Sequence, residues 1–249
     1  MKGFLEFENL IMKRPYIKKL GRAADFIIWI VDGKYIRDNI DVEFTNEGQH
    51  RGFNFIPKNE FWIDKNRNPE EDKYYIDSMI RMNKFLSEGM SYKDAVNKDD
   101  DIEKEERIKN YPKEILENPK KAIENKSIYL KLLKKYSRKI KVWIVDGKTV
   151  RDLFYVQFTE GGNEKIYPFI PKNEIWIDND LSRREIKAVL LHELHERKLM
   201  SEGGEYLKYD RRADDAHKDS SRIESYCRKH PEELDKELKK VIEENNRLE

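Results

Sequence analysis

The chain has 249 residues, of which 40% are charged and 38% hydrophobic, so we expect small cores and densely charged surfaces. Fifty basic and 49 acidic residues leave a net charge of +1, which excludes bulk attraction to a nucleic acid or an anionic membrane. Cys227 is the single cysteine, so we expect no disulfide framework within the chain. We also predict a cytoplasmic protein, because no apolar run reaches membrane length and the N-terminus has no signal-peptide core.

Two parts of the chain repeat each other. The run W-I-V-D-G-K occurs at 29–34 and 143–148, and F-I-P-K-N-E occurs at 55–60 and 169–174, so both pairs are offset by 114 residues. Beyond Gly203 the offset becomes 121, because the second copy has gained seven residues near 204–213. We predict tandem copies at 16–118 and 141–249, the second with a terminal helix, joined by a helical linker at 119–140.

A short helix is expected ahead of each β-sheet, at 16–20 and, within the linker, at 129–133. An Asp-Gly pair lies between β-prone runs at 32–33 and again at 146–147, a pattern typical of a two-residue hairpin turn. In the second copy, a further hairpin is predicted over 155–170 and a last strand at 175–177.

Helices follow the strands in the second copy. Apolar residues keep helical spacing over 182–200, with Asp180 or Ser182 as N-cap and Gly203-Gly204 as the stop. Further helices are predicted at 214–227 and from Pro231 to the end of the chain. The predicted fold class is therefore α+β, with each copy built from two antiparallel β-hairpins followed by a helical hairpin.

The run L-H-E-L-H-E at 191–196 carries the residues best suited to chemistry. Residues four apart on a helix lie on one stripe, so His192 and Glu196 can chelate a metal ion from one face. Glu193 projects about 100° round the helix, where a carboxylate can reach a water bound to the ion.

Residues 175–196 resemble the strand, acidic loop and active-site helix of small zincin metallopeptidases, including the ImmA/IrrE type, which bear H-E-x-x-H on that helix. The resemblance covers about 50 residues. It implies that His192 and the residue four later bind zinc, and that Glu193 is the general base in peptide-bond hydrolysis. It also implies that the substrate backbone lies along the sheet edge ahead of the helix. This sequence departs from the pattern at Glu196, which gives H-E-x-x-E, and adds His195.

The second predicted helix offers His217 or Glu224 as a third ligand. Glu224 corresponds to Glu103 in the first copy, whereas the residues corresponding to the proposed site are Ser78, Met79, Arg81, Met82 and Val96. Since the first copy has lost every other candidate ligand, Glu224 is interpreted as structural, in a pair with an arginine, and His217 as the ligand. Replacement of a proposed ligand by His195 or Glu224 remains an open alternative.

The sequence therefore predicts a zinc-dependent peptidase in the second copy, with a protein or peptide as substrate or partner and with neither nucleic acid nor membrane. The metal ligands are His192, Glu196 and His217, the base is Glu193, and the first copy is degenerate. The alternatives are a non-enzymatic structural or interaction module, of a viral or phage type, with at most a structural metal, and a regulator that binds another protein through its charged helices.

Overall fold

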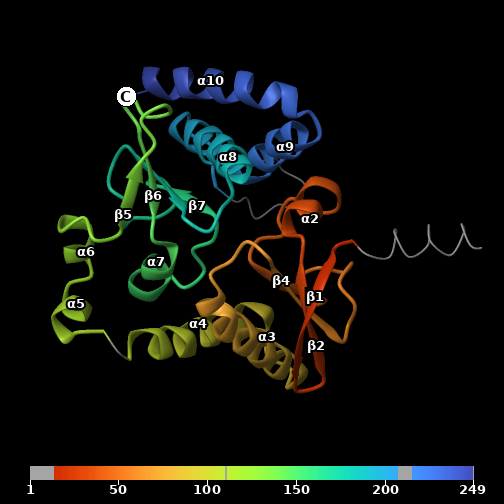
Figure 1. Cartoon of the computed structure of the whole chain (residues 1–249). Helices are drawn as coiled ribbons and strands as arrows, with labels where there is room; N and C mark the ends of the chain where they lie inside the picture. Colours follow the sequence, from red (N-terminus) through yellow and green to blue (C-terminus); the bar gives the residue numbers. More distant parts are fainter. Residues whose placement is uncertain (1–13, 110, 207–214, 249) are drawn as a thin grey trace, which may run out of the picture. The chain divides into compact units, whose positions relative to one another are not determined.

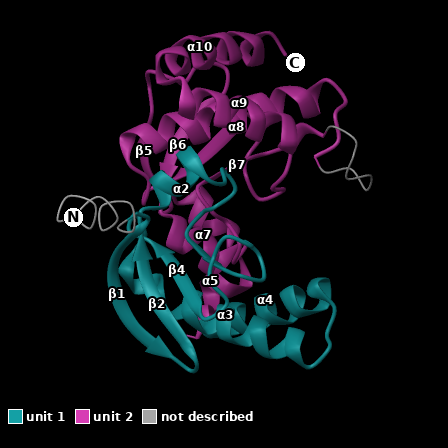
Figure 2. Cartoon of the chain, turned by 90° about the vertical axis from the view of Figure 1, so that its right-hand side faces the viewer, with its two compact units in different colours: residues 1–106 teal, residues 107–249 magenta. Residues whose placement is uncertain are grey.

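The computed structural model describes residues 14–109, 111–206 and 215–248. The chain forms two compact units, residues 1–106 and 107–249, coloured separately in Figure 2. Each unit combines helices with a four-stranded mixed sheet, which confirms the prediction of an α+β chain in two parts. The second unit contains residues 119–140, which were predicted as a linker.

The first unit has the strand order β1-β2-β4-β3. Its strands are β1 (Tyr16–Ala23), β2 (Phe26–Val31), β3 (Glu47–Gln49) and β4 (Glu60–Asp64). Its helices are α2 (Gly33–Asn39), η1 (Pro69–Glu71), α3 (Asp72–Ser87) and α4 (Tyr92–Ile108), and α4 runs into the second unit. The central pair β2·β4 is parallel, and both outer pairs are antiparallel.

The second unit has the equivalent order β5-β6-β8-β7, with the same parallel and antiparallel pairs. Its strands are β5 (Tyr129–Leu132), β6 (Lys141–Val145), β7 (Gly161–Asn163) and β8 (Glu174–Asp178). Its helices are α5 (Lys113–Glu117), α6 (Lys120–Glu124), α7 (Gly147–Leu153), α8 (Arg183–Ser201), α9 (Ala216–Lys229) and α10 (Pro231–Arg247). Trp143 pairs with Trp176 across the central strands, as Trp29 pairs with Trp62 in the first unit.

Strand β8 is buried on both faces, which explains its continuous apolar sequence. Because side chains alternate along a strand, Ile175 and Ile177 pack with α8, while Trp176 packs with α7 and the loops on the opposite face. Helix α8 lies between the sheet and α10 (Figure 1) and buries Leu190 and Leu194 in the same core. This packing fixes the position of α8 relative to the strands.

The Asp-Gly pairs do not form the predicted hairpin turns. Asp146 is instead the N-cap of α7, where its carboxylate accepts a hydrogen bond from the Thr149 amide at 3.3 Å. Gly147 is needed for a close approach, because a Cβ atom there would lie 2.1 Å from Oδ2 of Asp178. Asp32 caps α2 in the same way. Strands β6 and β8 therefore pair in parallel, which no hairpin allows.

The predicted opening helices are also wrong, because residues 16–20 and 129–133 contribute strands β1 and β5. Each segment is too short for its apolar spacing to distinguish helix from strand, and pairing with β2 or β6 decides the outcome. The linker at 119–140 is accordingly not simply helical, since it holds the short α6 and then β5.

The second predicted hairpin, over 155–170, contains only strand β7. After β7 the carbonyl of Asn163 accepts hydrogen bonds from the amides of Ile166 and Tyr167, at 3.2 and 3.0 Å. These bonds turn the chain back on itself where a second strand was expected. The strand at 175–177 is confirmed as β8.

The helices of the second copy agree well with the sequence. Helix α8 has Ser182 as its N-cap and ends just before Gly203, which adopts a left-handed conformation with φ of 96°. Helices α9 and α10 are also present, and Asp215 caps α9. Residue 214, the predicted start of α9, and most of the seven-residue insertion lie outside the described residues.

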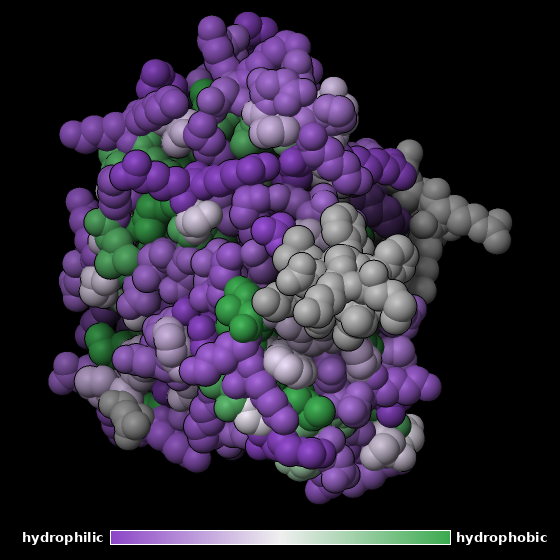
Figure 3. Space-filling view, turned by 45° about the vertical axis from the view of Figure 1, so that its right-hand side comes forward, coloured by the Kyte–Doolittle hydropathy of each residue, from purple (hydrophilic) through white to green (hydrophobic). Residues whose placement is uncertain are grey.

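The face of the molecule in Figure 3 is mostly hydrophilic, and its hydrophobic areas are small and separate. This agrees with the high charged fraction of the sequence. Among the described helices, none combines the length and the apolar character that crossing a lipid bilayer requires.

Candidate metal centre

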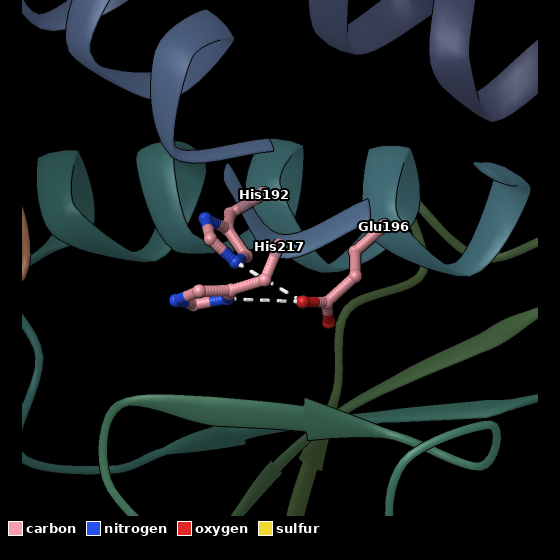
Figure 4. A group of neighbouring side chains, drawn as sticks. All are labelled: His192, Glu196 and His217. Atoms are coloured by element: carbon pink, nitrogen blue, oxygen red, sulfur yellow. Dashed lines mark hydrogen bonds and ion pairs between the residues drawn. The ribbon is translucent and has the colours of Figure 1, made fainter. Parts of the chain in front are cut away.

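The residues predicted to bind metal come from two neighbouring helices of the second unit. The apolar stripe of α8 faces the sheet and α10, which leaves His192 and Glu196, one turn apart, toward α9. His217 lies in the first turn of α9. Figure 4 shows the two imidazole rings beside the carboxylate of Glu196.

The three side chains offer donor atoms at distances that suit a single cation. Oε1 of Glu196 lies 3.6 Å from Nε2 of His192 and 3.1 Å from Nδ1 of His217. One ligand atom from each residue lies within 4.8 Å of the other two. Tetrahedral zinc with bonds of about 2.0–2.1 Å separates neighbouring ligand atoms by about 3.3 Å. The cluster therefore fits zinc with small movements of side chains.

Charge within the cluster also favours a cation. Burial opposes the charged form of His192, but hydrogen bonds to Glu196 and Glu224 raise its pKa well above the ordinary value. Burial likewise acts to raise the pKa of Glu196, yet the hydrogen bonds with His192 and His217 leave it lowered. The carboxylates around His192 thus favour a positive charge at this point, which a bound metal ion would supply.

Glu193 lies beside this cluster and is 7% exposed. Its Oε2 accepts a hydrogen bond of 2.9 Å from Nδ2 of Asn163, and the same amide donates to Oε2 of Glu196 at 3.2 Å. Burial, and then the charge of Glu196, raise the pKa of Glu193 to about 8. One amide from β7 thus positions both carboxylates.

Sequence reasoning missed Asn163, because nothing local marks an asparagine in a short edge strand as a partner of a distant helix. Tyr167 was missed too. Its ring lies so close to Gly162 that a Cβ atom there would be 2.5 Å from Cδ2. Burial raises the pKa of Tyr167, and the charges of Glu193 and Glu196 contribute. The corresponding residue of the first copy is Phe53, which lacks the hydroxyl. Comparison of the two copies could therefore have pointed to Tyr167.

The two open alternatives, Glu224 and His195, have hydrogen-bond partners of their own. Glu224 accepts hydrogen bonds from Nε of Arg228 at 2.8 Å and from Nδ1 of His192 at 2.9 Å, so it pairs with an arginine as predicted. Nδ1 of His195 instead lies 3.1 Å from the hydroxyl of Ser220, and burial lowers the pKa of His195. Neither residue belongs to the group of three potential ligands.

The corresponding helices of the first unit are joined by charged side chains. Arg81 and Ser78 both donate to the carboxylate of Asp99, and Arg81 also lies 3.8 Å from Glu103. Within residues 14–109, no three metal-binding side chains meet as they do in the second unit. Contacts of Arg81 with Asp99 and Glu103 thus join the helices of the first unit that correspond to α8 and α9.

Comparison of the chain with protein-family models, curated proteins and solved structures gave no match.

Proposed function

We propose that the second unit is a zinc-dependent hydrolase of peptide bonds, in which His192, Glu196 and His217 hold the ion and Glu193 handles the proton. One observation carries the proposal: four side chains from α8 and α9 converge, and Asn163 of β7 holds two of them. The proposal combines these contacts with the resemblance of the sequence to zincins, with glutamate in place of the second histidine ligand.

The chemistry of the donor set supports zinc. Two imidazoles and a carboxylate are common zinc ligands, and catalytic sites with three protein ligands keep one position for water or substrate. Zinc bound there would act as a Lewis acid toward a water molecule and a substrate carbonyl. The side chain of His217 is 26% exposed, compared with 11% for His192 and 1% for Glu196, so solvent reaches the cluster from the His217 side.

Glu193 is the group suited to move the proton. Asn163 occupies its Oε2, which makes Oε1 the oxygen that accepts a proton from the attacking water and passes it to the leaving amine. Without a metal ion, burial and the charge of Glu196 raise the pKa of this carboxyl to about 8. A positive ion nearby would shift this pKa downward and favour the basic form.

Strand β7 forms the sheet edge next to this cluster, since among the described strands it pairs with β8 alone. An extended peptide bound along this edge would pass close to Glu193, since Asn163 belongs to the strand. The three residues of β7 are buried, and the Tyr167 ring covers Gly162. Peptide binding along β7 therefore requires the residues that follow the strand to move aside.

A second candidate is a non-enzymatic module in which the metal only joins two helices. All three ligands come from α8 and α9, so an ion would cross-link them whether or not any reaction occurs. The two candidates differ in the role of Glu193, which a structural site does not need.

Glu193→Gln tests this difference. Zinc-loaded wild-type protein and the variant are incubated with a peptide library, and cleavage is followed by mass spectrometry, with Glu202→Gln as an exposed control at the end of the same helix. We expect unchanged zinc content and a loss of cleavage of about 10²-fold or more in Glu193→Gln only. Equal cleavage by the variant, or none by the zinc-loaded wild type, would contradict the proposal.

A further inference from the structure

Behind His192 lies a continuous chain of buried charged groups that the proposed reaction does not itself use. Nη1 of Arg228 donates to both oxygens of Glu185, at 2.9 and 3.0 Å, and Arg228 also binds Oε1 of Glu224. The other oxygen of Glu224 lies 2.9 Å from Nδ1 of His192. The side chains of Glu185, Glu224 and Arg228 are at most 7% exposed. This series of charged groups thus runs from Glu185 at the start of α8, through α9, to the proposed metal ligand His192.

The direction of the last hydrogen bond follows from the charge of Glu224. Its carboxylate is paired with the guanidinium of Arg228, whose Nε lies 2.8 Å and Nη2 2.7 Å from Oε1, and an arginine keeps its charge in proteins, so Glu224 is held ionised. An ionised carboxylate only accepts hydrogen bonds, so Nδ1 of His192 must donate. A metal-binding imidazole is neutral and has one donor and one acceptor nitrogen. Nε2, which faces Glu196 at 3.6 Å, is therefore the nitrogen whose lone pair is available to a metal.

We propose that Glu224 is a positioning residue for the metal site: it fixes the ring orientation and tautomer of His192, and Arg228 with Glu185 holds Glu224 in place. The inference rests on the proposed zinc site and adds a role that the three ligands alone do not explain. Partners of this kind raise the basicity of a ligating imidazole, and their loss typically weakens metal binding by 10–100-fold.

The first copy provides a control that distinguishes this positioning role from a role in folding. It keeps glutamates at 71 and 103 and an arginine at 107, the positions that correspond to Glu185, Glu224 and Arg228. The residue that corresponds to His192 is Ser78, and Glu103 lies 3.8 Å from Arg81. The carboxylate on the second helix thus also occurs in the first unit, where no metal cluster is found among residues 14–106 and Ser78 takes the place of the histidine. Glu103→Gln is therefore the matched control for Glu224→Gln.

The experiment measures zinc affinity by competition with a chromophoric chelator, together with the melting temperature of each metal-free protein. We expect Glu224→Gln to weaken zinc binding by about 10–100-fold. Glu103→Gln should leave the affinity unchanged, even if both variants melt at lower temperature. Tight zinc binding by Glu224→Gln equal to that of the wild type would overturn the inference. A wild-type protein that binds no zinc would instead overturn the proposed site, and the inference with it.

A second measurement needs no variant, in case Glu224→Gln does not fold. Long-range ¹H–¹⁵N spectra of the zinc-loaded wild type report which imidazole nitrogen of His192 carries the proton. Protonated Nδ1 and metal-bound Nε2 are expected. The opposite assignment would rule out orientation by Glu224.

Discussion

Zinc should stabilise the second unit and leave the first unchanged. A ligand that binds only the folded state at 100 times its Kd adds about 2.7 kcal/mol. For a unit of the size of residues 107–249, 1 kcal/mol corresponds to about 4 °C in Tm, so zinc should raise the Tm of this unit by roughly 10 °C. The first unit has Ser78, Met82 and Val96 at the ligand positions and should not respond.

Differential scanning calorimetry with zinc and with a chelator measures this shift. His217→Val introduces the residue of the first copy at a partly exposed position, so the metal-free variant should melt close to the metal-free wild type. The zinc-dependent shift should nevertheless disappear. Equal zinc-dependent shifts in the variant and the wild type, or no shift at saturating zinc, would refute the assignment of His217 as a ligand.

Other consequences of the structure can be measured separately. Tyr167→Phe introduces the ring found in the first copy and should leave zinc affinity unchanged. We expect kcat to fall about 10²-fold at constant KM if the hydroxyl stabilises the negative charge that develops in the reaction, and an unchanged kcat would exclude that role. Zinc affinity should fall as the pH is lowered through the raised pKa of His192, because a proton then competes with the metal; a pH-independent affinity would contradict binding by this imidazole. In the metal-free protein, the lowered pKa of Glu224 contributes stability that is fully present above its unfolded value of about 4.5 and lost as the pH falls toward about 2, and urea titrations at several pH values should show this loss. Gly147→Ala forces a Cβ atom onto Asp178, whose buried ion pair with Arg151 measures 2.6 Å, and should cost about 3–5 kcal/mol in urea unfolding; a loss below about 1 kcal/mol would show that the loop adapts.

The sequence predicted the structure correctly where a local pattern is compatible with only one structure. Helical spacing, the N-cap at Ser182 and the stop near Gly203 gave α8 nearly to the residue. The repeat gave two units of like topology, because equal sequences at equal spacing fold alike. The convergence of His192, Glu196 and His217 followed from helical geometry together with their joint absence from the first copy.

The predictions were wrong where a local pattern is compatible with two structures. An Asp-Gly pair suits a hairpin turn, but Asp146 caps a helix and Gly147 makes room for Asp178, a contact 31 residues away that no local pattern reveals. Short runs such as 129–133 become strands only because a partner strand is present. Asn163 and the bond from Glu224 to His192 are likewise tertiary contacts, which local sequence does not encode.

The central claim is that one metal ion joins α8 and α9 beside Glu193. Anomalous diffraction at the zinc absorption edge, from crystals grown with zinc, tests it most directly. We expect a single strong peak in the second unit, about 2.0–2.1 Å from Nε2 of His192 and within bonding distance of Glu196 and His217. Zinc elsewhere in well-ordered crystals, with these three side chains turned away from one another, would contradict the claim.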